Sequence, residues 1–440
     1  MCAGQWTTLR EWQCGFNIYI MDRYDIIVIG GGPAGIFAAG YAAQQGARVL
    51  LAEKTALLGK KLLITGKGRC NLTNARGRDA FIASYGKNGP FLYRAFNEYF
   101  TEDLIDFFLQ RGVATKVERG DRVFPESDES ESIVAVLRHF LDEEKVAVRF
   151  NSRVNRIIVT PEGAVSGVRL DNGTVFNAPC VILATGGVSY PRTGSTGDGY
   201  RLAQELGHTV IEPRAGLVPL ETAEDFVKEI QGLGLKNVKV RLLSGGKKIA
   251  EEFGEMLFTH FGVSGPVVLT LSGEAVDRLA RDETVELSVN FKPALDSQTL
   301  TLRLLREFES AGLKTITNII KTLLPLSLVP VFVRLCGVAP AKKANQITRV
   351  ERERIQALLT DFRLRVTKSR PVDEAIVTRG GISLKEIDPQ TMGSKKLPGL
   401  YFCGEVIDID GTTGGYNLQA AFSTGYLAGK TAGEKFREHL

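Results

Sequence analysis

The sequence predicts an α/β protein whose parallel sheet is assembled from both ends of the chain. Three stretches lead to this prediction, because each is an apolar run that enters a glycine-rich turn: residues 26–35, 180–187 and 399–415. Apolar, β-branched runs of this kind suit parallel strands that are buried on both faces. Between residues 207 and 370 such junctions stop, so we expect a separate β-rich domain and a small helical domain there.

The first of these turns has the spacing of a dinucleotide-binding turn. Gly30, Gly32 and Gly35 follow the expected strand 26–29 as G-x-G-x-x-G, and a helix of small residues is expected from Ala34 to Gln45. The first glycine permits a tight turn, the second lets a pyrophosphate approach, and the third lets helix pack on strand. This order of elements predicts a Rossmann-like domain. The expected cofactor contacts are Gly30, Gly32, Pro33, Ala34 and Gly35.

An acidic residue ends the second expected strand. The strand expected at 48–53 contains the apolar run 49–52 and finishes at Glu53, about twenty residues beyond the glycines. A carboxylate at that place accepts hydrogen bonds from the adenosine ribose. Because the residue is an acid and not an arginine, FAD or NAD is favoured over NADP.

A basic, glycine-containing loop follows at residues 54–74. Its cations alternate with glycines, which suits a loop wrapped over a diphosphate or the edge of a flavin. The alternative is a solvated basic loop, although the polar residues grouped beside Arg69 offer many directed hydrogen bonds. The candidate cofactor contacts in this loop are Lys54, Lys61, Gly68, Arg69, Cys70, Asn71 and Thr73.

Amphipathic helices and short strands are expected next. Apolar residues at helical spacing predict helices at 90–111 and 130–144. Short strands are expected at 122–125, 146–150 and 153–159. A hairpin at 165–176, with an Asn-Gly turn, completes a small antiparallel meander that resembles the one in many flavoproteins. Val154, near the start of this meander, is a candidate cofactor contact.

A further buried strand returns the chain to the nucleotide-binding fold. Residues 180–183 are apolar and lead into Ala-Thr-Gly-Gly, whose small side chains let a turn lie close to a dinucleotide. A second glycine-rich stretch at 190–200 and a helix to Leu206 follow. The candidate cofactor contacts here are Ala184, Thr185, Gly186 and Gly187.

The middle of the chain has the pattern of an insertion. Apolar or alternating segments predict antiparallel strands at 238–243, 267–271 and 285–291. Helices interrupted by prolines are expected at 298–360, where the cation-rich segment 342–354 is interpreted as a solvated helix face and not as a nucleic-acid patch. The predicted division is an extension at 1–20, a nucleotide-binding domain at 21–206 and 371–440, a β-rich substrate domain at 207–297 and 361–370, and a helical domain at 298–360.

The last part of the chain predicts the flavin end of the cofactor site. Strands are expected at 361–366, 375–377 and 399–405, with a glycine turn at 378–382 and a final helix to Gly429. An acid after a strand can accept from ribityl hydroxyls, and a helix N-terminus stabilises charge on a reduced flavin. FAD is therefore the predicted cofactor. The candidate contacts are Gly404, Glu405, Asp408, Gly414, Gly415, Tyr416, Asn417 and Leu418.

Composition limits the remaining possibilities. The 440 residues are 44% hydrophobic and 24% charged, which is ordinary for a globular protein, and the net charge is +5. Six cysteines without a C-x-x-C pair and four histidines without ligand spacing predict no disulfide framework and no metal site, so reduced thiols in the cytoplasm are expected. No apolar run has the length of a membrane span, and residues 1–20 lack the pattern of a signal peptide. That segment is expected to contribute nothing to the fold.

Together, these motifs resemble the two-dinucleotide-binding-domain flavoproteins, and more narrowly the bacterial NAD(FAD)-utilizing dehydrogenases, also called YhiN or BaiN-like flavoproteins. The stretches that carry the resemblance are 30–35, 66–74, 184–187, 258–266 and 404–417. The resemblance implies tightly bound FAD, a β-barrel-like insert with a small helical domain, and a role such as aminoacetone oxidase or bile-acid alkene reductase. A wider resemblance to fumarate reductase and ketosteroid dehydrogenase flavoproteins implies C=C reduction or desaturation.

The expected function is that of an FAD-dependent oxidoreductase, in which hydride moves to or from flavin N5. The substrate would be a small molecule bound between the flavin and the insert. The catalytic candidates are Tyr416, His260 and Arg69. Cys70, Arg379 and Asn417 are also expected near the ring. For His260 and Tyr416, a purely structural hydrogen bond is an equal alternative.

Several functional alternatives stay open at this point. Only one complete G-x-G-x-x-G unit occurs, so NAD(P)H would bind only transiently as an electron donor. The alternatives are an amine oxidase that uses O₂, a fumarate-reductase-like ene-reductase, an RNA-modifying flavoprotein suggested by the isoelectric point of 8.8, and a non-catalytic flavin sensor. The expected partner is a small-molecule substrate, with no stable nucleic acid and no membrane, and the oligomeric state is left open.

Overall fold

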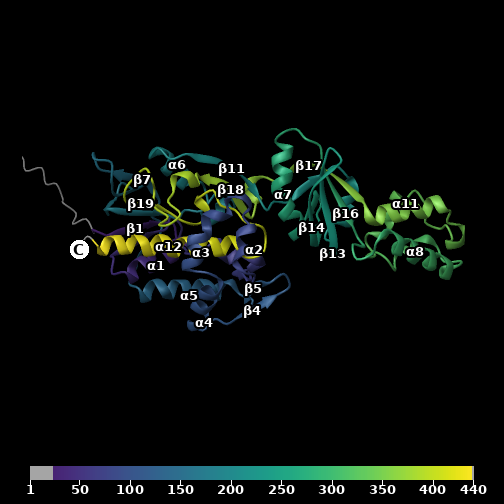
Figure 1. Cartoon of the computed structure of the whole chain (residues 1–440), viewed down its shortest axis with the longest axis horizontal. Helices are drawn as coiled ribbons and strands as arrows, with labels where there is room; N and C mark the ends of the chain where they lie inside the picture. The colour runs from purple at the N-terminus through teal and green to yellow at the C-terminus, as the bar shows by residue number, and fades with distance from the viewer. Residues whose placement is uncertain (1–22, 439–440) are drawn as a thin grey trace, which may run out of the picture.

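The computed structural model describes residues 23–438, and the extension expected at 1–20 lies outside them. The described residues form an elongated molecule with three parts in a row (Figure 1). The nucleotide-binding domain contains both ends of the described chain, a β-barrel follows it, and a group of helices forms the far end.

The central sheet of the nucleotide-binding domain is parallel throughout, with the strand order β19-β10-β1-β2-β6. Its strands are β1 (Ile26–Ile29), β2 (Val49–Ala52), β6 (Ala147–Arg149), β10 (Cys180–Leu183) and β19 (Leu400–Phe402). β19 pairs with β10 although the whole insert separates them in sequence. The prediction of a parallel sheet assembled from both ends of the chain is therefore confirmed.

Two helices from opposite ends of the chain cross at very short distance beside this sheet. The helices of the domain are α1 (Pro33–Gln44), α2 (Arg78–Ala83), α3 (Tyr93–Glu98), α4 (Thr101–Gln110), α5 (Ser130–Glu143), α6 (Asp198–Glu205) and α12 (Tyr416–Arg437). A Cβ added to Gly425 of α12 would lie 2.3 Å from the carbonyl oxygen of Ala34 in α1, and one added to Gly429 would lie 2.3 Å from that of Ala38. The contact between α1 and α12 therefore requires glycine at both positions.

Two small antiparallel sheets complete the domain. They consist of β7 (Val154–Val159), β8 (Val165–Leu170) and β9 (Val175–Asn177), and of β3 (Thr73–Asn74), β5 (Arg122–Pro125) and β4 (Thr115–Glu118). The first sheet confirms the meander predicted from the Asn-Gly turn. The predicted helical segment 90–111 contains the two helices α3 and α4, and 130–144 contains α5.

A two-stranded ribbon joins this domain to the insert. It consists of the antiparallel strands β11 (Val210–Gly216) and β18 (Val377–Ile382). The prediction of a glycine turn at 378–382, directly after a strand, was wrong, because the strand itself occupies these residues. A Cβ on Gly380 would lie 2.5 Å from the carbonyl oxygen of Glu212, and one on Gly381 would lie 2.7 Å from that of Val406. These glycines permit close approach of neighbouring backbones and do not reverse the chain.

The β-rich part of the insert is a closed six-stranded barrel. Around the barrel the strands are β12 (Leu220–Thr222), β15 (Gly262–Ser264), β14 (Lys247–Phe258), β13 (Gly234–Ser244), β16 (Val285–Asn290) and β17 (Phe362–Ser369). The strand predicted at 238–243 is confirmed as part of β13, and those predicted at 285–291 and 361–366 are confirmed as β16 and β17 with slightly different bounds. The long strand β14 was not predicted.

The segment 267–271, predicted as a strand, is instead part of helix α7 (Pro266–Leu279). Its β-branched run favours a strand locally. However, Gly265 at φ +94° turns the chain, and Pro266 occupies the first helical turn, where proline is well tolerated. The residues that α7 buries fall on one helical face: Val267, Val268, Leu271, Ser272 and Ala275.

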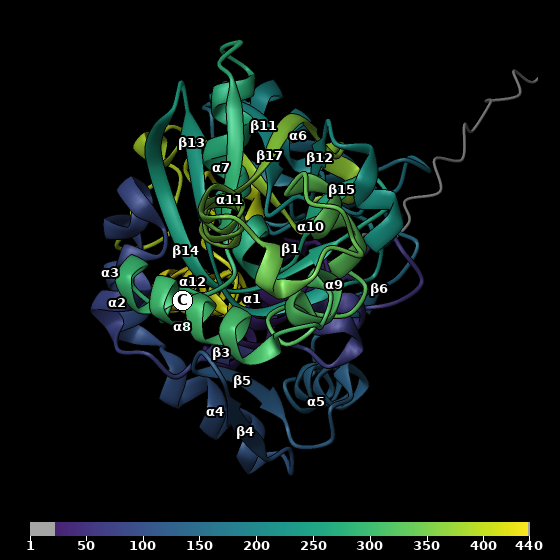
Figure 2. The same ribbon diagram turned by 90° about the vertical axis from the view of Figure 1, so that its right-hand side faces the viewer.

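The far end of the molecule is helical, as predicted for residues 298–360, and it shares one continuous apolar core with the barrel. Its helices are α8 (Ser297–Ala311), α9 (Ile316–Ile320), α10 (Val329–Leu335) and α11 (Arg349–Thr360). Pro330, expected to interrupt a helix, lies in the first turn of α10. Figure 2, which faces this end, shows the four helices in front of the barrel.

The described residues contain neither a membrane-spanning helix nor a metal-binding cluster. Within residues 23–438, no helix combines the length and the apolar character that crossing a membrane requires. Over the same residues, no cluster of His, Cys, Asp and Glu has the makings of a metal site. The domain boundaries proposed from the sequence stay predictions.

Candidate functional site

The turn between β1 and α1 leaves open space in front of the helix. A Cβ on Gly30 would lie 2.6 Å from the carbonyl oxygen of Ala184, and one on Gly35 would lie 1.8 Å from that of Gly30. These two glycines are therefore required by packing within the domain. Gly32, in contrast, has no described atom within 4 Å of an added Cβ. The space at Gly32 faces the N-terminal amides of α1, where a phosphate group is stabilised.

The carboxylate of Glu53 lies beside this turn at the end of β2. One oxygen accepts from the backbone N–H of Gly31 (2.7 Å) and the other from that of Thr55 (2.7 Å), and the residue is only 8% exposed. The backbone N–H of Ser152 donates to the Glu53 carbonyl (2.9 Å), which brings the segment that leads into Val154 next to it. The predicted cofactor contacts Glu53 and Val154 thus belong to one neighbourhood.

A second carboxylate, Glu405, connects three distant parts of the chain. It accepts from Lys61 Nζ (2.8 Å), from the Ser189 hydroxyl (3.2 Å) and from the backbone N–H of Thr378 (2.8 Å). A Cβ on Gly186 would lie 4.0 Å from the same carboxylate. The Ala-Thr-Gly-Gly turn, the basic loop and the ribbon therefore converge at the predicted flavin end. Ser189 and Thr378 were not predicted from the sequence, which gives them no motif of their own.

The glycines before α12 press against the basic loop. A Cβ on Gly415 would lie 2.2 Å from the carbonyl oxygen of Thr73, and Asn74 Nδ2 donates to the carbonyl of Gly414 (2.9 Å). Asn417 closes this turn by accepting from the backbone N–H of Gly411 (2.8 Å). The structure therefore places the candidates Thr73, Gly414 and Asn417 at the N-terminus of α12.

Two predicted basic contacts are instead engaged by acidic side chains. The Arg69 guanidinium is held by Glu118 and Asp128 (Nε to Oδ1, 2.8 Å), and these partners raise its pKa above the usual range. Lys54 Nζ donates to Asp198 Oδ2 (2.8 Å). Neither side chain belongs to the hydrogen-bonded group around Glu405.

Other predicted residues also lie apart from that group. His260 is exposed in the turn between β14 and β15, with its ring edge-on to Phe261. Tyr416 is buried, and its ring packs against that of Phe81 with centroids 4.7 Å apart. Burial raises the pKa of the Cys70 thiol to about 12, so this thiol stays protonated and unreactive at neutral pH.

A cluster around Arg379 lies where the nucleotide-binding domain meets α7. Arg379 donates to the carbonyl of Gly273 (2.9 Å) and to Asp277 Oδ2 (3.1 Å), and its Nε lies 3.5 Å from Asp410 Oδ2. Burial raises the pKa of Asp410 to about 6, although Arg379 opposes the shift. Sequence reasoning named Arg379 but missed Asp410 and Asp277. The position of Asp410, between Glu405 and the final glycines, could have indicated it.

Two further hydrogen bonds tie the barrel to the nucleotide-binding domain. The hydroxyls of Thr270 in α7 and Thr413 before α12 lie 3.2 Å apart. Arg119 Nη2, at the turn between β4 and β5, donates to Asn237 Oδ1 of β13 (2.7 Å). These two hydrogen bonds and the contacts of Arg379 with α7 thus all connect the nucleotide-binding domain with the insert.

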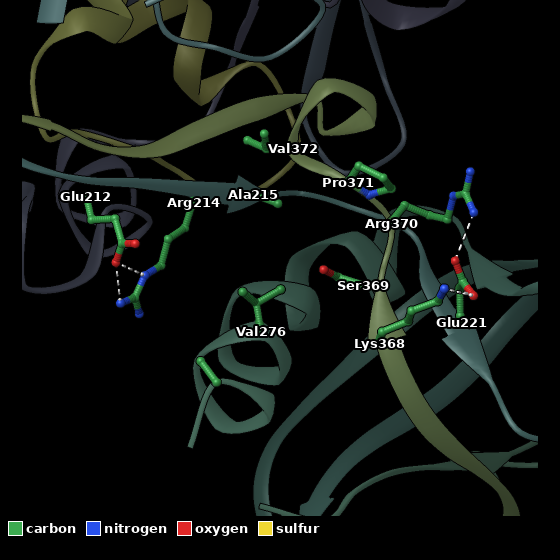
Figure 3. Close-up of a pocket in the computed structure, with 11 residues that line it drawn as sticks. Glu212, Arg214, Ala215, Glu221, Val276, Lys368, Ser369, Arg370, Pro371 and Val372 are labelled. Atoms are coloured by element: carbon green, nitrogen blue, oxygen red, sulfur yellow. Dashed lines mark hydrogen bonds and ion pairs between the residues drawn. The ribbon is translucent and has the colours of Figure 1, made fainter. Parts of the chain in front are cut away.

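A cavity of about 480 Å³ opens beside the ribbon, on another part of this junction (Figure 3). Its charged side chains are paired with one another: Arg214 with Glu212 (2.9 Å), and both Lys368 (3.3 Å) and Arg370 (2.8 Å) with Glu221. Neither Glu405 nor Asp410 lines this cavity. It separates the barrel from the ribbon and does not contain the predicted flavin-end residues.

Replacing Asp410 with asparagine is expected to stabilise the protein at neutral pH. Because its folded-state pKa is raised from 3.8 to about 6, protonation favours the folded state. Its contribution to stability is therefore full below about pH 4 and is lost as the pH rises through about 6. We expect Asp410→Asn to raise the free energy of unfolding by up to about 3 kcal/mol at pH 7 and by little near pH 4. Urea titrations at both pH values measure this, and an equal gain at both would contradict it.

The arrangement fits FAD. The open space at Gly32 faces the amides of α1, and the buried carboxylate of Glu53 lies beside the same turn. Gly30–Gly35 and Glu53 would hold the adenosine diphosphate half, and the Glu405 group would hold the flavin half.

Comparison with known proteins gives one family and several relatives. The HI0933-like protein Rossmann domain family matches residues 24–431. The 3-dehydro-bile acid delta(4,6)-reductase of Clostridium scindens is 32% identical over 412 residues, which cover 93% of this chain and 98% of that protein. The ribosomal RNA dihydrouridine synthase of Escherichia coli is 34% identical over 414 residues, which cover 92% of this chain and 97% of that protein.

A solved structure agrees with the fold. The 3-ketosteroid delta1-dehydrogenase of Sterolibacterium denitrificans, in complex with 1,4-androstadiene-3,17-dione, covers 94% of this chain and 100% of its own with a TM-score of 0.53 and 14% identity. The parallel sheet with its three glycine junctions is thus the predicted FAD-binding Rossmann domain. Since the family match spans nearly the whole described chain, this protein belongs to the HI0933-like family and is an FAD-dependent oxidoreductase.

Proposed function

We propose that this protein uses reduced FAD to saturate a C=C bond that is conjugated to a carbonyl group. The observation that carries the proposal is the chemistry in the names of its two relatives. Both names describe the saturation of such a bond: one enzyme is a delta(4,6)-reductase of a 3-oxo bile acid, and the other forms dihydrouridine. The two relatives differ in substrate, so the shared reaction is the part that transfers to this chain.

This reaction requires hydride at one carbon and a proton at the other. Bound FAD, when reduced, supplies the hydride from N5. The chain has to supply the proton and to stabilise negative charge on the carbonyl oxygen. We assign the proton to Asp410, whose raised pKa keeps part of its population protonated near neutral pH, and the charge stabilisation to Arg379 beside it.

The assignment of Asp410 and Arg379 differs from the catalytic candidates that were predicted from the sequence. Arg69 is held by two carboxylates, and His260 is exposed on a turn of the barrel. Tyr416 stays a candidate proton donor, although its ring is packed in an aromatic cluster. Arg379 is better placed to contact a substrate between the two domains, because its side chain connects the nucleotide-binding domain with α7.

Of the two substrate classes, we favour a uracil base in RNA over a small unsaturated ketone. The chain has an isoelectric point of 8.8, and a basic protein attracts phosphate-bearing substrates. NAD(P)H would act as the transient donor that reduces the flavin. Oxidation of an amine by O₂ is the second candidate reaction, and it predicts oxygen consumption with aminoacetone.

Reoxidation of the flavin tests the proposal directly. The bound FAD is photoreduced without oxygen and mixed with an unmodified ribosomal RNA transcript, free uridine or a steroid 4-en-3-one. We expect the transcript to reoxidise the flavin and to gain two hydrogens per modified base by mass spectrometry. Reoxidation by the steroid alone would move the substrate to the small-molecule class, and failure of all three compounds would contradict the proposal. Bleaching of oxidised enzyme by NADH or NADPH identifies the donor.

A matched pair of variants tests the role of Arg379. Arg379→Gln is expected to slow reoxidation by roughly a hundredfold without loss of FAD, since it removes charge stabilisation near the substrate. Arg214→Gln is the control, because Arg214 also lies near Asp277 (3.6 Å) but belongs to the other strand of the ribbon. Equal rates in the two variants would remove Arg379 from the mechanism.

A further inference from the structure

The positive charge of this protein is concentrated at the end farthest from α1 and α12. We call residues 297–360, which include α8 to α11, the helical tip. The helical tip has ten Lys and Arg residues against four Asp and Glu residues, a net charge of +6. The whole chain has a net charge of +5. The remaining residues are therefore almost balanced, and the basic character of the protein belongs to the helical tip.

Most of these cations have no acidic partner. Four of the ten form ion pairs: Arg303 with Glu307, Arg334 with Glu229, Lys342 with Glu351, and Arg349 with Glu353. Within residues 23–438, the other six have no carboxylate within 4.0 Å: Arg306, Lys314, Lys321, Lys343, Arg352 and Arg354. All but Arg352 are exposed. Such side chains are free to meet an anionic partner.

Two of the unpaired cations are held next to each other by the backbone. The N–H of Ala344 donates to the carbonyl of Lys314 (2.9 Å), and Thr315 forms an antiparallel bridge with Lys343. Like charges that are fixed as neighbours repel each other in the free protein. A row of phosphates relieves this repulsion and releases its own counterions, which makes such a surface favourable for a polyanion.

The position of the helical tip argues for a polymer. Figure 1 shows the barrel between the tip and β18, the strand that carries Arg379, so one small molecule bound near Arg379 gains nothing from the charges on the tip. A folded RNA is long enough to reach both places. Exposed apolar side chains among the cations, Leu313 (70%) and Val350 (56%), can contact sugars and bases.

We propose that the helical tip binds the phosphate backbone of an RNA whose target base enters the junction at Arg379 and Asp410. This inference rests on the proposed function for its substrate class. It departs from the sequence-based interpretation of 342–354 as a solvated helix face, and from the expectation that no nucleic acid is bound. The departure follows from the missing acidic partners of the six cations.

Salt-dependent binding is the test. A fluorescently labelled, unmodified ribosomal RNA hairpin is titrated with the full-length, FAD-loaded protein over a range of KCl concentrations. The test variant carries Lys314→Gln, Lys343→Gln and Arg354→Gln. We expect it to bind at least tenfold more weakly at low salt, and to lose about two to three units from the slope of log K against log [KCl].

A control variant has the same change in charge at the opposite end of the molecule. It carries Arg138→Gln, Lys435→Gln and Arg437→Gln, three exposed residues of α5 and α12. This control is expected to bind RNA within about twofold of the wild type. Flavin content and thermal unfolding, measured for both variants, show that each is folded. Equal RNA binding by the two triple variants would overturn the proposal.

Two further readouts separate the possible causes of failure. If the test variant loses binding to phosphatidylglycerol vesicles but keeps its affinity for RNA, the surface recognises a membrane and the proposal is overturned. Reoxidation of the reduced flavin by free uridine or by the steroid does not need the helical tip and should be equal in the two variants. If RNA binds through the helical tip but never reoxidises the flavin, the proposed RNA-binding surface is supported and the proposed reaction is contradicted.

Discussion

Replacing Gly32 with valine is expected to give a folded protein that no longer retains FAD. The backbone at Gly32 is extended (φ −82°, ψ −178°), a conformation that valine adopts without strain. No described atom lies within 4 Å of the added Cβ, so the protein itself tolerates the side chain. The side chain would instead occupy the space where a pyrophosphate approaches the amides of α1. Losing about 3 kcal/mol of binding free energy would weaken FAD affinity more than about a hundredfold.

The measurement compares flavin absorbance per protein with the melting temperature of the FAD-free form. Gly77→Val is the matched control, because Gly77 is also extended (φ −65°, ψ 161°), lies directly before a helix, α2, and has open space around an added Cβ. The control is expected to keep its flavin. If Gly32→Val retained FAD, the pyrophosphate would have to bind elsewhere.

Gly425→Val is expected to be far more damaging, because it acts on the protein and not on the ligand. The first added carbon would lie 2.3 Å from the carbonyl oxygen of Ala34 and 2.9 Å from its Cα. These are backbone atoms that no rotamer change can move, so α1 and α12 have to separate. We expect a loss of about 3 kcal/mol or more of the free energy of unfolding. The same shift would displace the start of α1 and release FAD.

Chemical unfolding followed by far-UV circular dichroism measures this effect. Lys435→Val, an exposed position on the same helix, is the control and should change the free energy of unfolding by less than about 1 kcal/mol. Gly425→Val and Gly32→Val should differ in kind, since only the first destabilises the FAD-free protein. Equal stability of Gly425→Val and the control would show that the α1–α12 contact can relax.

The parts of the fold that were predictable are those in which local chemistry and tertiary structure agree. The strand at 26–29 is buried on both faces, as its uninterrupted apolar run predicts. The segment 267–271 shows the opposite case, because its β-branched residues favour a strand while Gly265 and Pro266 start a helix. The burial of one face of α7 against the barrel decides the outcome, and that face is not visible in a five-residue window.

The residues of the candidate site also differ in whether the sequence could predict them. The glycines of the first turn and Glu53 follow each other within one βαβ unit, so their spacing alone brings them together. The Arg379 cluster, in contrast, joins the ribbon, α7 and the loop before α12, three elements far apart in sequence. No spacing rule connects Asp277 with Asp410. Arg69 was predicted near the cofactor from the basic character of its loop, whereas its acidic partners, Glu118 of β4 and Asp128 before α5, lie outside that loop.

The crossing of α1 and α12 also sets an order of events during synthesis. The ribosome makes α1 long before α12, so the close backbone contacts of Ala34 and Ala38 with Gly425 and Gly429 cannot form until α12 has emerged. The barrel and helical tip are contiguous in sequence and have their own core, so they can fold while the nucleotide-binding domain is still incomplete. Capture of FAD then waits for the last helix, and a chain that stops early would stay colourless. Yellow colour in a nascent-chain preparation would thus report that α12 has emerged from the ribosome.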